Sequence, residues 1–287
     1  MPPTESLTER LARALAAGPS IATQAAAAAL AGLRGCDAPG AAAVVARDDE
    51  LCRLLAAGFG QEAALAARLA ELAGAARCLG CGACCRVSSP TLYQEDLALL
   101  GPQGPGREHF YTLRAGEEVH SARLGRRQVL EQELIKLCEA PGGACVFLGP
   151  GGCAIYDQRP LQCRWLECWS GRHAGQLSGR PRLTRTQAFA GDHTARALAA
   201  EFERKLPAAR LAGLLAAAAG GDDQAAEEAL AVLEQDHGLR AAIGGRYGYG
   251  AAELKLLLGR PATAIARAYG LAVELDPDDR PRLRRMT

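Results

Sequence analysis

Four cysteines lie within eight residues of one another, in the order Cys-Leu-Gly-Cys-Gly-Ala-Cys-Cys. They are Cys78, Cys81, Cys84 and Cys85. Two-residue spacers allow a turning backbone to direct successive sulfur atoms at one centre, as happens in zinc sites and iron–sulfur clusters. The run therefore predicts a metal centre rather than four unrelated buried thiols.

A second group of cysteines follows about sixty residues later, so that the middle of the chain offers eight candidate thiolate ligands. This second group consists of Cys145, Cys153, Cys163 and Cys168. The other three cysteines do not fit the pattern. Cys138 lies outside the spacing, and Cys36 and Cys52 stand in alanine-rich helical surroundings, so we expect these last two to be plain core residues.

The first cysteine loop is close in sequence to the loop of bacterial ferredoxins, in which three such cysteines bind three corners of a [4Fe–4S] cluster. Gly80 and Gly82 permit tight turns with positive φ, which let backbone amides point at sulfur. Leu79 has an aliphatic side chain suited to covering one face of a cluster. A ferredoxin would add a distant cysteine followed by proline, whereas here Cys85 follows Cys84 directly, so the chain is not a ferredoxin.

The middle segment as a whole resembles the YkgJ-type cysteine-cluster family, described as zinc- or iron-chelating domains. That family shows CxxCxxCC, a cysteine beside an apolar pair, and then Cys-x-Ile-Tyr-x-x-Arg-Pro-x-x-Cys-Arg. The counterparts here begin at Cys78, at Cys145 and at Cys153, and the resemblance covers roughly Arg77 to Trp169. It implies metal binding, and because related domains occur in flagellin lysine N-methylases it also implies that some members serve enzymes.

Arginines near the cysteines fit a negatively charged centre. Four thiolates around Zn²⁺ or a [4Fe–4S]²⁺ core carry a net charge of about −2, which cationic neighbours and N–H donors stabilise. Arg159 and Arg164 flank the second cysteine group, and we expect them to support the centre from outside its ligand set. Tyr156 is a further candidate hydrogen-bond donor.

Two classes of function remain open at this point. In the first, the eight cysteines hold an iron–sulfur cluster and the protein is a redox or accessory factor. In the second, they hold structural zinc and the domain is an interaction module. An iron–sulfur-dependent, methyltransferase-like enzyme is a third alternative that rests on the resemblance alone. The ferredoxin-like loop favours iron–sulfur, because zinc sites more often use two CxxC pairs and the second group contains none. No catalytic residue can be named from the spacing.

The overall composition of the chain limits the kinds of partner, and the cellular compartment, that we expect. Lysine and arginine number 33 against 32 aspartates and glutamates, which gives a net charge of +1 and no electrostatic reason to expect nucleic acid. The alanine-rich stretch at residues 25–33 is shorter than the roughly 20 residues that span a bilayer, so we expect no membrane insertion. Without a secretory signal we expect the cytoplasm, where eleven cysteines favour metal over disulfides.

The texture of the sequence predicts a mainly α fold in three parts: an N-terminal helical region (1–76), a cysteine-cluster metal-binding domain (77–192) and a C-terminal helical region (193–287). A capping box at Ser6 and Glu9 begins the first helix. A short antiparallel β meander is expected within Glu133–Tyr156, between glycine turns. The helical regions carry apolar stripes that are either buried or available to a protein partner, namely Leu7/Leu11/Leu15 and Leu198/Phe202/Leu206. The oligomeric state stays open.

Overall fold

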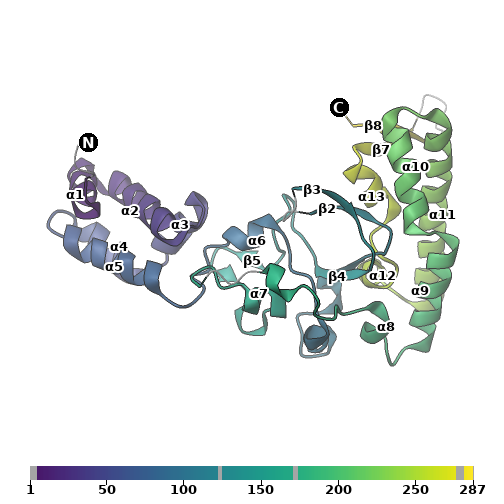
Figure 1. Ribbon diagram of the computed structural model, residues 1–287, viewed down its shortest axis with the longest axis horizontal. Helices are drawn as coiled ribbons and strands as arrows, with labels where there is room; N and C mark the ends of the chain where they lie inside the picture. The colour runs from purple at the N-terminus through teal and green to yellow at the C-terminus, as the bar shows by residue number, and fades with distance from the viewer. Residues whose placement is uncertain (1–4, 122–124, 171–173, 276–280, 287) are drawn as a thin grey trace. The chain divides into compact units, whose positions relative to one another are not determined.

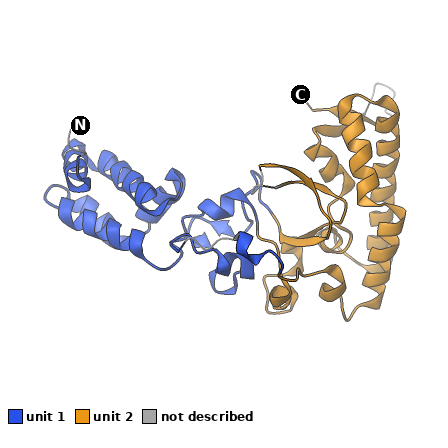
Figure 2. Ribbon diagram, in the orientation of Figure 1, with its two compact units in different colours: residues 1–89, 139–179 blue, residues 90–138, 180–287 orange. Residues whose placement is uncertain are grey.

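The computed structural model describes residues 5–121, 125–170, 174–275 and 281–286. The chain divides into two compact units, and each unit is built from two separate stretches of sequence (Figure 2). Unit 1 comprises residues 1–89 and 139–179, and unit 2 comprises residues 90–138 and 180–287. The cysteine-rich segment predicted at 77–192 therefore contributes to both units, and its independence as a domain remains a prediction.

Five helices make the N-terminal part of unit 1. They are α1 (Leu7–Ala17), α2 (Pro19–Arg34), α3 (Ala38–Val45), α4 (Asp49–Ala57) and α5 (Glu62–Gly74) (Figure 1). The predicted capping box is confirmed, since the Ser6 hydroxyl accepts from the Glu9 amide and the Ser6 amide donates to the Glu9 carboxylate. Asp37 and Asp48 cap α3 and α4 more simply, since a side-chain oxygen of each accepts one backbone amide.

Leucines at helical spacing form the core of this bundle. Leu30, Leu51, Leu65 and Leu69 are completely buried. Leu11 and Leu15 of the predicted N-terminal stripe are buried in the same core, and Leu7 packs against it. The stripe is therefore used inside the bundle.

The remainder of unit 1, as far as the structure describes it, consists of short elements. They are α6 (Ala83–Val87), β5 (Leu148–Gly149), β6 (Gly152–Cys153), the 3-10 turns η3 (Tyr156–Gln158) and η4 (Ala174–Leu177), and α7 (Leu161–Trp165). Three of them carry cysteines: α6, β6 and α7. Strands β5 and β6 form a tight antiparallel hairpin in which Leu148 stands opposite Cys153. Such short pieces have little core of their own, so their positions depend on contacts with the helical bundle.

Unit 2 combines three antiparallel strand pairs with helices. The paired strands are β1 (Phe110–Leu113) with β4 (Leu134–Leu137), β2 (Glu118–Ser121) with β3 (Arg126–Val129), and β7 (Leu271–Leu275) with β8 (Pro281–Arg285). The helices are η1 (Gln94–Leu100), η2 (Arg107–His109), α8 (Arg185–Ala188), α9 (His193–Lys205), α10 (Ala208–Gly220), α11 (Asp223–Tyr247), α12 (Ala251–Leu258) and α13 (Ala262–Ala268). Phe202 and Leu206 of the second predicted stripe are buried within this unit.

The mainly α architecture with short antiparallel strands is confirmed. The confinement of strands to Glu133–Tyr156 is wrong, because β4 pairs with β1 and further pairs form elsewhere in unit 2. The segments that pair show only weak alternation of apolar and polar residues in the sequence. Tertiary contacts therefore decide which segments form strands. Among the described residues, no helix is both long and apolar enough to cross a bilayer.

Candidate metal centre

The first cysteine loop leaves the helical bundle just after α5 and turns on two glycines. Gly80 and Gly82 have φ of +67° and +76°, so both adopt the predicted left-handed conformation. The Gly80 amide donates to Cys78 Sγ at 3.3 Å, which confirms the prediction that the turn aims amides at sulfur. At Gly82 a Cβ atom would lie 2.9 Å from Leu148 Cδ1, so only glycine fits where the loop meets the β5–β6 hairpin. Helix α6 then carries Cys84 and Cys85.

The second cysteine group reaches this loop through the backbone. The Cys145 amide donates to the Cys85 carbonyl oxygen at 2.8 Å, which joins the two groups directly. The chain then forms the β5–β6 hairpin, which presents Cys153, and α7, which presents Cys163. Leu79 packs against the core of the helical bundle and so anchors the loop, while its covering of one face of a cluster remains a prediction.

Six of the eight predicted ligands share one electrostatic neighbourhood. Burial raises the pKa of Cys163, and the charges of Cys84, Cys145 and Cys153 raise it further. Burial likewise raises the pKa of Cys153, on which Cys78 and Cys84 also act. The six thiols are those of Cys78, Cys84, Cys85, Cys145, Cys153 and Cys163. A site of this kind favours loading with a cation, because a cation removes the repulsion between the thiolates.

Cys84 and Cys85 form the most strongly interacting pair in the group. Their sulfur atoms lie 3.9 Å apart. The hydrogen bond from Cys85 lowers the pKa of Cys84, while the same hydrogen bond and then burial raise the pKa of Cys85. This shared hydrogen bond favours the thiolate at Cys84 and the thiol at Cys85.

The remaining cysteines have different surroundings. Cys81 packs beside Cys36 at the edge of the bundle core, and Cys168 is exposed just after α7. Cys138 lies in unit 2 against Tyr111, Leu113 and Leu130. Cys52 is exposed on α4, so its predicted core position is wrong; its thiol lies against the carbonyl oxygens of Val45 and Ala46 at the end of α3.

The donor set fits a thiophilic metal. Soft thiolates bind zinc and iron–sulfur clusters. The Gly80 amide donates to Cys78 Sγ, and hydrogen bonds of this kind are typical around such centres. In the part of the chain that the structure describes, no three cysteine, histidine or carboxylate side chains already stand in a closed coordination geometry. Which of the eight predicted cysteines bind the metal therefore remains a prediction.

The predicted supporting arginines differ in position. Arg159 lies within electrostatic reach of Cys84, Cys153 and Cys163. Its guanidinium stacks 3.6 Å above the centre of the Tyr156 ring, and its Nε donates to the Tyr156 carbonyl at 2.7 Å. The cation is thus held in place beside the thiols. Arg164 follows Cys163 on α7 and its side chain is exposed.

Two arginines that sequence reasoning missed fasten the cysteine loops to the helical bundle. Arg34, at the end of α2 and 8% exposed, donates to the carbonyls of Ala73, Ala75 and Arg77 at 2.6–2.8 Å. Its guanidinium also stacks on the ring of Trp169, at 5.3 Å from the centroid. These carbonyls end α5 and lead directly into Cys78, so Arg34 fixes where the first loop starts.

Arg47, which follows α3, connects both cysteine loops. Its guanidinium donates to the Pro150 carbonyl at 2.6 Å, to the Gly80 carbonyl at 3.1 Å and to the Leu79 carbonyl at 3.3 Å. Pro150 lies in the turn before Cys153, and Leu79 follows Cys78. No local signal marks this arginine, because its partners lie 32 to 103 residues away.

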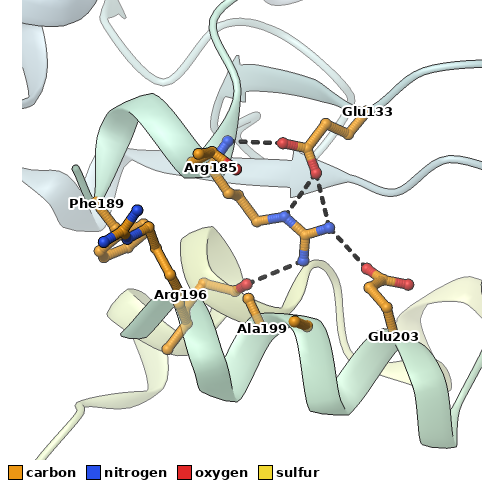
Figure 3. Close-up of a pocket in the computed structure, with 9 residues that line it drawn as sticks. Glu133, Arg185, Phe189, Arg196, Ala199 and Glu203 are labelled. Carbon is orange, nitrogen blue, oxygen red and sulfur yellow. Dashed lines mark hydrogen bonds and ion pairs between the residues drawn. The ribbon is translucent and has the colours of Figure 1, made fainter. Parts of the chain in front are cut away.

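Unit 2 contains a separate buried charge network around Arg185 (Figure 3). Arg185 is 8% exposed and donates to the carboxylates of Glu133 and Glu203, each at 2.7 Å, and to the Leu257 carbonyl at 3.1 Å. The residues border a cavity of about 150 Å³ that is also lined by Phe189. Glu203 also pairs with Arg114 at 3.2 Å, so both carboxylates are engaged with arginines, and the network joins the residue before β4 to α8, α9 and α12.

Comparison with known proteins bears on the middle of the chain alone. Neither the comparison with curated proteins nor that with solved structures gives a match. A family model does match, over residues 77–187, a range that draws on both compact units and includes all eight predicted ligands. Residues 77–187 are therefore similar to the CxxCxxCC family, whose description is "putative zinc- or iron-chelating domain".

Proposed function

We propose that the metal of this domain is an iron–sulfur cluster, [4Fe–4S] in type, and that the protein serves as a redox or accessory factor for a protein partner. The observation that carries the proposal is the conformation of the Cys78–Cys84 loop. In this loop Gly80 and Gly82 adopt the left-handed conformation, and the Gly80 amide donates a hydrogen bond to Cys78 Sγ. Ferredoxin-type loops surround a cluster by the same features.

The charges near the thiols support the same proposal. Four thiolates on a [4Fe–4S]²⁺ core leave a charge of about −2. Arg159 supplies a fixed cation beside three of the thiols, and the Gly80 amide supplies a hydrogen bond to a fourth. A bound cluster supplies one-electron transfer, and hydrogen bonds to sulfur and nearby charge set its potential. The chain's own part is to hold the ligands, exclude water and balance the charge.

The test compares two metals on the same chain. Metal-free protein is offered equal amounts of ferrous and ferric iron with sulfide, or zinc, without oxygen, and the bound metal is counted for the unaltered chain and for Cys81→Ser and Cys163→Ser. We expect iron and sulfide to be retained by the unaltered chain and lost by both variants, with Cys52→Ser as the matched control that keeps them. Retention of zinc alone would favour the structural zinc module instead.

A potential measurement then tests the redox role. Removal of the Arg159 charge in Arg159→Gln should make the cluster harder to reduce, so its midpoint potential should fall, because a cation near the cluster favours the added electron. Arg164→Gln, at an exposed position, is the control. A cluster that cannot be reduced and reoxidised would contradict the redox role while leaving the metal assignment in place.

A further inference from the structure

Cys36 lies in the short loop between α2 and α3 of the N-terminal bundle. Gly35 ends α2 in the left-handed conformation, with φ of +70°. Asp37 begins α3 and accepts from the Gly40 amide at 2.9 Å. Cys36 stands between these two caps and is half-buried. Its backbone is therefore fixed from both sides, and the place of its thiol is set before any ligand binds.

The start of α3 is in direct contact with Cys81. A Cβ atom at Gly40 would lie 2.4 Å from the Cys81 carbonyl oxygen, so the two backbones meet without an intervening side chain. Arg86 closes the contact from the other side, donating through Nε to the Asp37 carboxylate and through Nη2 to the Cys81 carbonyl, each at 2.9 Å. The residue after Cys36 is thereby tied to the cysteine loop.

The two thiols are neighbours as a result. Cys36 and Cys81 both pack against the bundle core. The Cys36 and Cys81 thiols lie close enough to interact through a side-chain hydrogen bond. Cys81 is thus the member of the CxxCxxCC run that faces a cysteine from outside the matched segment 77–187.

We propose that Cys36 is a further ligand of the metal centre, so that the N-terminal bundle completes the site together with Cys81. This inference rests on the proposed function, since it needs the CxxCxxCC thiols to hold a thiophilic cation. Two thiols in contact on a fixed scaffold can bind one such cation when both lose their protons. The cationic Arg86 beside them stabilises the resulting negative charge.

The test follows cysteine reactivity in the full-length, unaltered chain. The chain is alkylated with and without iron and sulfide, and each cysteine is quantified by peptide mass spectrometry. We expect alkylation of Cys36 to slow at least roughly ten-fold on loading, in step with Cys81, while the exposed Cys52 changes little. Equal alkylation of Cys36 with and without metal, while Cys81 and Cys163 are protected, would overturn this inference and leave the proposed function standing.

A pair of variants separates ligation from packing. Cys36→Ala should lower iron affinity by at least roughly ten-fold, the smallest loss expected even for a supporting group. Its metal-free melting temperature should match that of Cys52→Ala, because Cys36 is only half-buried. An affinity within two-fold of the unaltered chain would rule Cys36 out as a ligand. If loading protects no cysteine at all, the proposed function itself fails.

Discussion

Replacement of Arg47 by alanine should weaken the metal centre without touching any cysteine. From its position just after α3, the Arg47 guanidinium donates to the carbonyls of Leu79, Gly80 and Pro150. These carbonyls lie in the two loops that present Cys78 and Cys153. With the arginine removed, both loops lose their common attachment to the bundle.

The expected size of the effect follows from these three contacts. A hydrogen bond from a charged group contributes about 1.5–3 kcal/mol when water cannot replace it. Arg47 is half-buried, and the longest of its three contacts is 3.3 Å, so water recovers much of that sum. We expect a net loss of about 2 kcal/mol, which corresponds to about 30-fold if all of it falls on metal binding. That lies inside the roughly 10–100-fold range measured for groups that orient metal ligands.

The assay is competition between the chain and a chelator for iron, read at equilibrium, together with thermal unfolding of the metal-free chain. The part of the loss that falls on folding should appear as a melting temperature lower by up to about 4–8 °C. Arg53→Ala, at an exposed position on α4, is the matched control, and Arg47→Lys should recover part of the loss. If Arg47→Ala changed neither affinity nor melting temperature, the reasoning about the bundle as a scaffold would be refuted.

Three further outcomes follow from the same contacts. Arg185→Met should destabilise unit 2 by about 3 kcal/mol in a denaturant titration, because it leaves two carboxylates beside a buried site, while metal bound per folded chain stays the same. The hydrogen bond from Arg68 lowers the pKa of Asp48 in the folded chain. This pair therefore stabilises the bundle at pH values above about 3.9, the pKa of an aspartate in the unfolded chain, and the stabilisation is lost as the pH falls through the lower pKa of the folded chain. Asp48→Asn should thus cost about 1 kcal/mol in urea unfolding at pH 7 and nothing at a pH below both values; an equal cost at both pH values would contradict this. Cys81→Ser or Cys163→Ser should make the segment from Arg77 to Trp169 protease-sensitive and leave the bundle resistant, since metal binding is coupled to folding in such loops.

Local sequence signals predicted the features that depend on neighbouring residues. The Ser6–Glu9 box and the leucine spacing gave the helices, because a cap and a 3.6-residue period act within one or two turns. The same holds for the turns at Gly80 and Gly82, where positive φ follows from the need to direct amides at sulfur. These parts needed no knowledge of the rest of the chain.

Features set by distant contacts could not be predicted in this way. Strand β4 pairs with β1 across a span that includes another hairpin, and its sequence does not say which partner it takes. Arg34 and Arg47 resemble any surface arginine until the carbonyls they bind are known. Cys36 packs against the bundle core as predicted, but its nearness to Cys81 depends on the approach of α3 to the cysteine loop, which no local signal reveals.

The central claim is most directly tested by the metal content of protein purified without oxygen. Iron, acid-labile sulfide and zinc are counted per chain, and the absorbance spectrum is recorded on the same sample. We expect a brown protein with a broad absorbance near about 400 nm and about four iron and four sulfide ions per chain. A colourless protein with stoichiometric zinc and no sulfide would contradict the iron–sulfur assignment.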